Sequence, residues 1–173
     1  YKKKDIAGMT ASEQLEKINE RTRELVTLQY NTYNRSLVPL MHQHGIVVMD
    51  AFEDLSEAQA AFVDRYFEDN VYPVLTPMAV DASRPFPLIR NKTLNIAALL
   101  SKKKGKAEKE EIEFATVQVP SVLPRLVHIP SEDGNEKTFI LLEQVIERNI
   151  DKLFLNYDVL CAYPYRVMRN ADL

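Results

Sequence analysis

The sequence is poor in the residues that build metal sites, disulfides and phosphate-binding loops. Its 173 residues include one cysteine, three histidines, four glycines and no tryptophan. Cys161 alone cannot form an internal disulfide, which is typical of a protein in a reducing cytoplasm. His42 and His44 are two positions apart, so they cannot share a metal as an i,i+4 helical pair does. No glycine lies in G-x-x-x-x-G-K-S/T or G-x-G-x-x-G, which excludes both common glycine loops for phosphate.

Charge and hydropathy exclude further classes. The formal net charge is -3, whereas a general nucleic-acid-binding domain usually has a basic excess. No apolar run approaches about 18 residues, so we expect no transmembrane helix. The length suggests one domain with an appended element. Because the chain starts at Tyr1 and stops at Leu173 without a cap, we expect it to be a piece of a larger protein.

Residues 1–45 predict one long helix that leads into the domain. Thr10 and Glu13 have the spacing of a capping box at its start, and Gly45 suits the position after its end. Apolar side chains between them recur at helical spacing. About 33 helical residues span about 50 Å, more than the roughly 40 Å diameter of a compact domain of this size. We therefore expect the helix to extend beyond its own domain; the alternative is a break at Pro39 into two core helices.

Residues 46–173 predict the rest of an α+β fold, a mainly antiparallel sheet packed with two further helices. A second capping box, Ser56 to Gln59, opens one helix, and an apolar face after Leu142 indicates the other. Apolar runs indicate strands at 46–49, 94–100, 112–119, 126–129, 138–142 and 160–168, the first of them buried. We expect the second and third of these strands to form an antiparallel hairpin around a charged loop, 101–110.

Prolines punctuate the segment 70–100, which is otherwise strongly apolar. They stand at Pro73, Pro77, Pro85 and Pro87. Each proline fixes its own φ and favours an extended residue before it. We therefore expect the preceding helix to end and the chain to cross irregularly to the next strand.

Basic residues at two kinds of position are candidates for anion contacts. Lys102, Lys103 and Lys104 belong to the only basic run, which is read either as a contact for a polyanion or as a solvated hairpin tip. Arg125 follows a rigid turn with two prolines, and Arg169 follows the last predicted strand. A guanidinium on rigid backbone suits a phosphate or a carboxylate, so both arginines are also candidates for Arg–Asp pairs within or between domains.

Three strings together resemble the polyphosphate kinase family. They are YPVLTP at 72–77 followed by RPFP at 84–87, VPSVLPR at 119–125, and YRVMRNAD at 165–172. Their order and approximate spacing also match, and the resemblance extends from about Ser12 to Leu173. It implies a parent enzyme that reversibly transfers the γ-phosphate of ATP to polyphosphate, with Mg²⁺ and through a phosphohistidine. This chain resembles the middle, or head, domain of such an enzyme.

The resemblance transfers no functional residue to this sequence. It implies that the catalytic histidine, the metal-associated arginines and the ATP contacts lie outside these residues, so we assign no catalytic, cofactor-binding or metal-binding residue. It further implies a homo-oligomeric parent, cytoplasmic or membrane-associated, with this domain framing the active-site tunnel. The alternative is a protein-interaction module for dimerisation, without phosphate chemistry. A self-contained nucleotide-binding enzyme is disfavoured, because no glycine loop or histidine-centred site is present.

Overall fold

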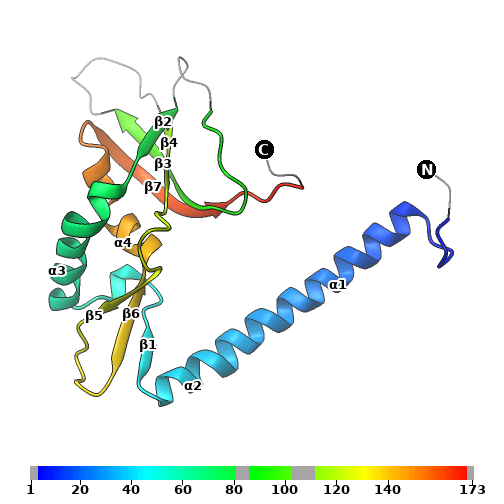
Figure 1. Ribbon diagram of the computed structural model, residues 1–173, viewed down its shortest axis with the longest axis horizontal. Coiled ribbons are helices and arrows are strands. Elements are labelled where there is room, and N and C mark those ends of the chain that lie inside the picture. The colour runs from blue at the N-terminus through cyan, green and yellow to red at the C-terminus, as the bar shows by residue number, and fades with distance from the viewer. Residues whose placement is uncertain (1–3, 81–85, 103–111, 171–173) are drawn as a thin grey trace. The chain divides into compact units, whose positions relative to one another are not determined.

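A computed structural model of the chain describes residues 4–80, 86–102 and 112–170 (Figure 1). Contacts within the chain separate it into two compact units, Tyr1–Ile46 and Val47–Leu173. Among the described residues, no helix is both long enough and apolar enough to cross a membrane. The α+β class is confirmed, with a long N-terminal helix, further helices and antiparallel strands.

The smaller unit consists of a helix in three consecutive segments. They are α1 (Ala11–Thr32), a π-helical turn η1 (Tyr33–Leu37) and α2 (Val38–Gln43). The capping box is confirmed: the Thr10 amide donates to Glu13 Oε2 over 2.7 Å, and the Glu13 amide donates to Thr10 Oγ1 over 3.4 Å. The Thr10 amide and hydroxyl both donate to the Glu13 carboxylate, which lowers its pKa. None of the three segments contains a buried residue.

Pro39 does not divide the helix. Its ring has no N–H to donate to the carbonyl four residues back and would clash with it in a regular turn. The wider π-helical turn directly before α2 accommodates this defect, and the helix continues to Gln43. The alternative with two separate core helices is therefore wrong. Gly45 has φ of 68°, the left-handed conformation expected after a helix end.

The larger unit contains two sheets. The four-stranded sheet has the order β2 (Pro77–Val80), β4 (Ile112–Gln118), β3 (Leu94–Lys102) and β7 (Tyr157–Arg166), and all its pairs are antiparallel. The three-stranded sheet has the order β1 (Ile46–Val48), β6 (Lys137–Leu141) and β5 (Leu126–Ile129). The hairpin of β3 and β4 is confirmed, with Ala98 opposite Ala115.

Helices cover one face of the four-stranded sheet. The first is α3 (Glu57–Tyr66), which continues into a π turn η3 (Phe67–Val71) and a 3₁₀ turn η4 (Tyr72–Val74). The second is α4 (Leu142–Arg148), which is followed by a 3₁₀ turn η5 (Ile150–Leu153). A separate 3₁₀ turn, η2 (Phe52–Asp54), precedes α3. Their side chains Phe67, Val145 and Ile146 join Ile96 and Leu100 of β3 in a single core. The predicted capping box at Ser56 is confirmed.

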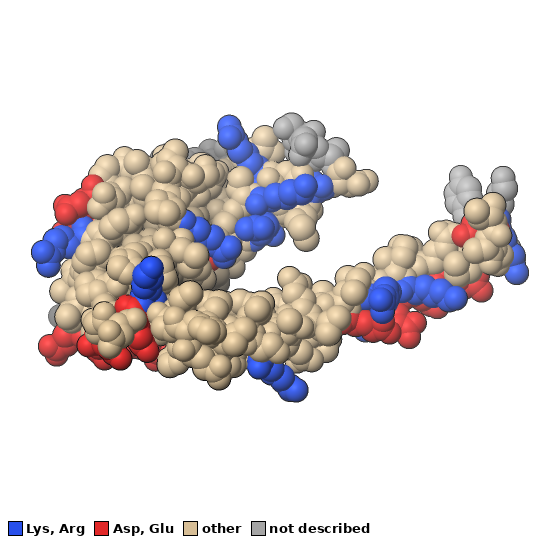
Figure 2. All heavy atoms as spheres, turned by 60° about the horizontal axis from the view of Figure 1, so that its bottom comes forward, with Lys and Arg blue, Asp and Glu red and all other residues tan. Residues whose placement is uncertain are grey.

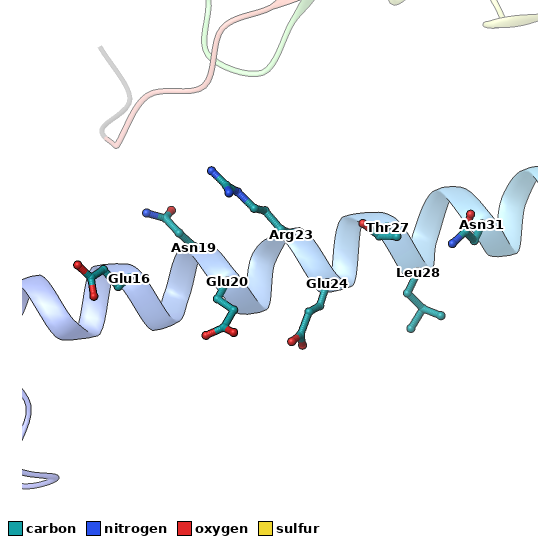
Figure 3. A pocket seen from close by; sticks show the side chains of 8 residues that line it. All are labelled: Glu16, Asn19, Glu20, Arg23, Glu24, Thr27, Leu28 and Asn31. Atoms are coloured by element: carbon teal, nitrogen blue, oxygen red, sulfur yellow. The ribbon is translucent and has the colours of Figure 1, made fainter.

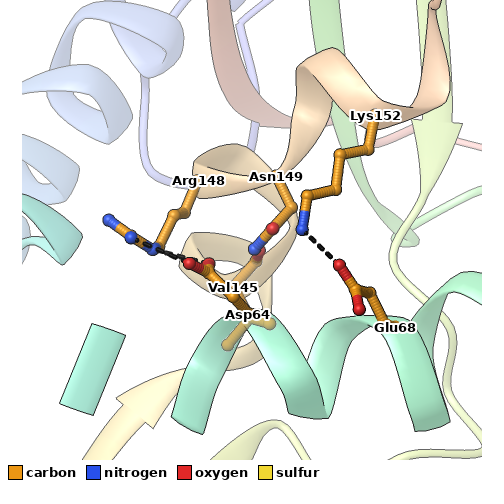
Figure 4. Close-up of polar contacts among 6 residues, drawn as sticks. All are labelled: Asp64, Glu68, Val145, Arg148, Asn149 and Lys152. Carbon is orange, nitrogen blue, oxygen red and sulfur yellow. Dashed lines mark hydrogen bonds and ion pairs between the residues drawn. The ribbon is translucent and has the colours of Figure 1, made fainter. Parts of the chain in front are cut away.

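Two ion pairs join α3 and η3 to α4 and η5 (Figure 4). Arg148 Nε lies 2.8 Å from Asp64 Oδ1, and Lys152 Nζ lies 2.7 Å from Glu68 Oε1. The Arg148 guanidinium lowers the pKa of Asp64, since it stabilises the ionised carboxylate. Asn149 donates to the carbonyl of Val145, which closes the end of α4. The two helices are therefore connected by charge as well as by the core beneath them.

Several predicted boundaries are wrong. The proline segment is not irregular throughout, because β2 begins at Pro77; this strand lies at the sheet edge, where a missing N–H is tolerated. The strand at 46–49 is not buried, since Ile46 is exposed. The predicted loop at 101–110 begins too early, because β3 continues to Lys102. The last strand runs from Tyr157 to Arg166 instead of 160–168, because pairing with β3 sets its ends.

Candidate functional site

A hollow of about 860 Å³ lies along α1 and is not a credible site. All the residues that line it come from this one helix. Figure 3 shows that their side chains leave the helix in different directions: Arg23 and Asn19 lie opposite Glu20 and Glu24. A single helix cannot enclose a ligand on several sides, as binding pockets do.

A second hollow of about 410 Å³ is acidic. Asp54, Glu132 and Glu136 contribute to its lining, and no Lys or Arg does. Across the part of the chain that the structure describes, no group of three or more His, Cys, Asp or Glu side chains is placed to hold a metal ion. The described residues therefore offer no metal site with three or more such ligands, and the acidic lining of this hollow does not attract a phosphate.

A third hollow, about 440 Å³ in volume, is basic and lies where distant segments of the larger unit meet. We call it the basic pocket and define it by its four cationic side chains, Arg90, Lys92, Arg125 and Arg166. Among the described residues, no Asp or Glu lines it, while Gln118 and Ser121 add uncharged polar groups. Its volume lies within the range of small-molecule sites, roughly 300–1,000 Å³.

Strand pairing brings these cations together. The turn 90–93 leads into β3, and Leu94 at the start of β3 pairs with Arg166 at the end of β7. Beside them, the amide of Val119 donates to the carbonyl of Leu94 over 2.9 Å, which fixes the loop that leads to Arg125. Three segments far apart in sequence thus contribute one positive charge or more each.

The turn 90–93 is held in an unusual conformation. Lys92 has φ of 62°, and it is the only non-glycine residue with positive φ among the described residues. This left-handed conformation costs an L-residue roughly 1–2 kcal/mol. The Lys92 amide donates to the Val167 carbonyl over 2.8 Å, and Thr93 Oγ1 donates to the Arg90 carbonyl over 2.9 Å. These bonds keep Arg90 and Lys92 on the pocket side of the sheet edge despite the strain.

Arg125 is compensated by a buried carboxylate. Its Nε lies 3.1 Å and its Nη2 2.5 Å from Glu143 Oε1. The Glu143 side chain is 6% exposed, whereas that of Arg125 is 59% exposed. The pair is therefore bidentate and anchored at its acidic end, which fixes the arginine at the pocket wall. The pair is internal, with a glutamate instead of the expected aspartate, and a contact of Arg125 with phosphate stays a prediction.

The other three cations are not compensated by a described carboxylate. Arg90, Lys92 and Arg166 are exposed and form no ion pair with any described carboxylate. In the space-filling view, several Lys and Arg side chains lie together at the upper right of the larger unit, where no Asp or Glu side chain of the described residues is seen (Figure 2). A concave surface with one sign of charge concentrates the potential that attracts an anion.

Of the other sequence candidates, the described Arg169 and Lys102 do not line the basic pocket. Arg169 instead supports the turn behind it: its amide donates to Asn91 Oδ1 over 2.9 Å, and its guanidinium donates to the Ile89 carbonyl. Lys102 ends β3, about 26 Å along the strand from Leu94 at about 3.3 Å per residue. Lys103 and Lys104 lie outside the described residues.

Sequence reasoning assigned no site role to Arg90, Lys92 and Arg166. The only signal in the sequence was their position: Arg90 and Lys92 precede β3, and Arg166 ends β7. Knowledge of the β3–β7 pairing would have placed all three at one sheet edge. None of the histidines lines the pocket: His42 lies in α2, His44 follows it, and His128 packs against the Phe139 ring at 5.3 Å.

Two family models match consecutive parts of the chain. The model of the polyphosphate kinase N-terminal domain matches residues 1–49, and that of the polyphosphate kinase middle domain matches residues 58–173. The chain belongs to the polyphosphate kinase family. The resemblance of the proline-containing strings is thereby confirmed. Within the family, the basic pocket falls in the segment that matches the middle domain, and α1 falls in the segment that matches the N-terminal domain.

Relatives of the polyphosphate kinase family cover almost the whole chain. The polyphosphate kinase of Lactiplantibacillus plantarum is 50% identical over 173 residues, which are 100% of this chain and 23% of that protein. The polyphosphate kinase of Halalkalibacterium halodurans is 45% identical over 99% of this chain and 24% of its own length. The chain therefore spans about a quarter of the length of the curated relatives it matches.

A solved structure shares this architecture. The crystal structure of the polyphosphate kinase from Porphyromonas gingivalis matches with a TM-score of 0.76 and 27% identity, over 92% of this chain and 25% of that one. The similarity thus includes the fold as well as the sequence.

Proposed function

We propose that this chain is a non-catalytic part of a polyphosphate kinase, residues 46–173 being its middle (head) domain and residues 1–45 the long helix that leads into it. The parent enzyme transfers the γ-phosphate of ATP to polyphosphate, reversibly and through a phosphohistidine outside these residues. The observation that carries this proposal is the match of two consecutive polyphosphate kinase domain models, in order, to residues 1–49 and 58–173.

The surroundings of the three histidines support a non-catalytic role for this chain. Transfer through a histidine needs a nucleophilic imidazole with cations or a metal placed around the phosphate. His42 and His44 belong to a helix end without a buried residue, and His128 packs on an aromatic ring. ATP and Mg²⁺ are therefore assigned to the rest of the parent, which is cytoplasmic or membrane-associated and homo-oligomeric.

Measuring ATP-dependent polyphosphate synthesis tests this proposal. The parent enzyme is compared with the 173-residue chain at equal concentration, with ATP and Mg²⁺ present. We expect turnover by the parent and none by the chain. Turnover by the chain alone would sink the non-catalytic role, and a parent that makes no polyphosphate would sink the assigned activity.

A second candidate function is a protein-interaction module that promotes dimerisation. It is favoured by α1, where Leu15, Ile18, Leu25 and Leu28 are each at least half exposed although they are apolar. Sedimentation of the chain with and without residues 1–35 addresses it. If removal of those residues changes neither association nor solubility, the helix has no interface role.

A further inference from the structure

We propose that the basic pocket is a binding site for a chain of phosphate groups, with Arg90, Lys92 and Arg166 as its ligands and the Glu143-paired Arg125 at its wall. This inference rests on the proposed function for the identity of the anion, inorganic polyphosphate. It goes beyond that function because it assigns a substrate-binding role to a domain without catalytic residues.

The charge balance of the pocket favours an anion. Four cations and no carboxylate line it in the part of the chain that the structure describes. Glu143 compensates Arg125 alone, which leaves three positive charges around one hollow of a chain whose net charge is -3. Three like charges around a concave surface repel each other, and a bound polyanion removes this repulsion.

The chemistry of the lining favours phosphate over a single carboxylate. Arg90 and Arg166 present planar guanidinium groups that can each donate two parallel hydrogen bonds to phosphate oxygens. Lys92 adds a compact charge, while the Gln118 amide and Ser121 hydroxyl supply neutral donors. Cations from separate segments suit an extended anion with charge on successive units, which a lone carboxylate lacks.

The backbone supports the same assignment independently. Lys92 stays in a left-handed conformation that glycine would adopt without strain, and this places a cation where a glycine would leave none. Its turn is fixed by the Lys92–Val167 hydrogen bond and by Arg169, which binds Asn91 and the Ile89 carbonyl. Strain that is retained beside a charged hollow is typical of functional positions.

Calorimetric titration of the chain with inorganic polyphosphate of defined length tests the site. The variant R90Q/K92Q/R166Q removes the three charges, and K17Q/R23Q/R35Q removes the same number and kinds of charge from the long helix. We expect saturable binding by the unmodified chain, weakened at least about tenfold in the pocket variant and less than about threefold in the control. Equal losses in both variants, or no loss in the pocket variant, would overturn the site.

A second variant separates binding from folding. Lys92→Gly removes one cation and also relieves the left-handed strain, so the melting temperature should stay the same or rise. We expect polyphosphate to bind about threefold or more weakly to this stable variant. Unchanged affinity with the glycine in place would contradict the role of Lys92.

Competition identifies the anion. An acidic peptide of aspartates with the same number of charges is added to the complex with polyphosphate. Weak competition supports a phosphate site, whereas equal competition would make the pocket a contact for an acidic protein segment and overturn the proposal.

Assaying the parent with R90Q/K92Q/R166Q keeps the two proposals distinct: a parent that synthesises polyphosphate with unchanged KM for polyphosphate contradicts the pocket and leaves the proposed function intact.

Discussion

The two units of the chain contrast in what holds them together. In the smaller unit, no residue of α1, η1 or α2 is buried, and caps and local hydrogen bonds define the helix. In the larger unit, side chains from helices and both sheets form one core that includes Val63, Phe67, Ile96 and Ile140. Interactions between residues close in sequence therefore determine the helix of the smaller unit, and interactions between residues distant in sequence determine the fold of the larger unit.

This difference has consequences for function. An isolated helix without a buried face gains little from tertiary packing, so its apolar residues are available to other parts of a larger assembly. The basic pocket, in contrast, exists only because the larger unit folds and pairs β3 with β7. Substitutions should therefore have large cooperative effects in the larger unit and small local ones in the helix.

The largest effect is expected from Phe67→Ala. Phe67 is fully buried, packs edge-on against Tyr72 at 6.0 Å between centroids, and lies under the Lys152 ammonium. We expect the free energy of unfolding to fall by about 3–5 kcal/mol, because the truncation leaves a cavity. Urea denaturation measures it. Phe86→Ala is the control, since Phe86 is 61% exposed; a loss as large in that variant would contradict the assignment of the core.

Arg125→Ala should destabilise the larger unit by about 3 kcal/mol. The buried Glu143 carboxylate would lose its bidentate partner, and an unpaired buried charge is costly. The double variant R125L/E143L removes both charges and should recover much of the loss in the same urea titration. If the double variant is less stable than Arg125→Ala, the pair itself, not the orphaned carboxylate, determines stability.

Part of this contrast could be predicted from the sequence. Both capping boxes follow from side chains three residues apart, so the starts of α1 and α3 were predicted correctly. The pocket was missed because Arg166 reaches the turn 90–93 only through strand pairing, which no local pattern encodes. Similarly, β2 was missed because its proline argued against a strand, although an edge position tolerates it.

Glu147→Gln should increase stability by about 1 kcal/mol at and above neutral pH. Partial burial, with Glu143 and Glu53 nearby, raises the pKa of Glu147 from 4.5 to about 7. Between these two values the folded chain binds more protons than the unfolded chain, so stability falls as pH rises. The residue is half-buried, which reduces the effect by solvent screening. Thermal melts from about pH 4 to 8, a range that includes both pKa values, measure the melting temperature as a function of pH. This temperature should depend less on pH in the variant, and an unchanged dependence would contradict the raised pKa.

The two capping boxes allow a matched comparison. Thr10→Ala and Ser56→Ala each remove the side-chain acceptor of a helix start, at a cost of about 1 kcal/mol. For Thr10 we expect faster hydrogen exchange only in the first turn of α1. For Ser56 we expect a lower unfolding midpoint for the whole larger unit, because Gln59 also donates to the Pro130 carbonyl. Global destabilisation by Thr10→Ala would contradict the local character of the helix.

The smallest effect is expected from Leu25→Gln. Leu25 is 50% exposed on α1, and glutamine has a similar helix propensity. The change in stability of the chain should stay within about 0.5 kcal/mol. Circular dichroism melts measure it, with Val63→Gln in the core as the contrasting variant. A loss above 1 kcal/mol for Leu25→Gln would show that this side chain is packed within the chain.

The most direct test of the account is to locate the phosphorylated residue of the parent enzyme. The parent is incubated with ATP labelled at the γ-phosphate, and its acid-labile label is assigned to peptides by mass spectrometry. We predict a phosphohistidine outside the 173 residues and no label on the three histidines within them. Label on His42, His44 or His128 would contradict the assignment of this chain as a non-catalytic part of the kinase.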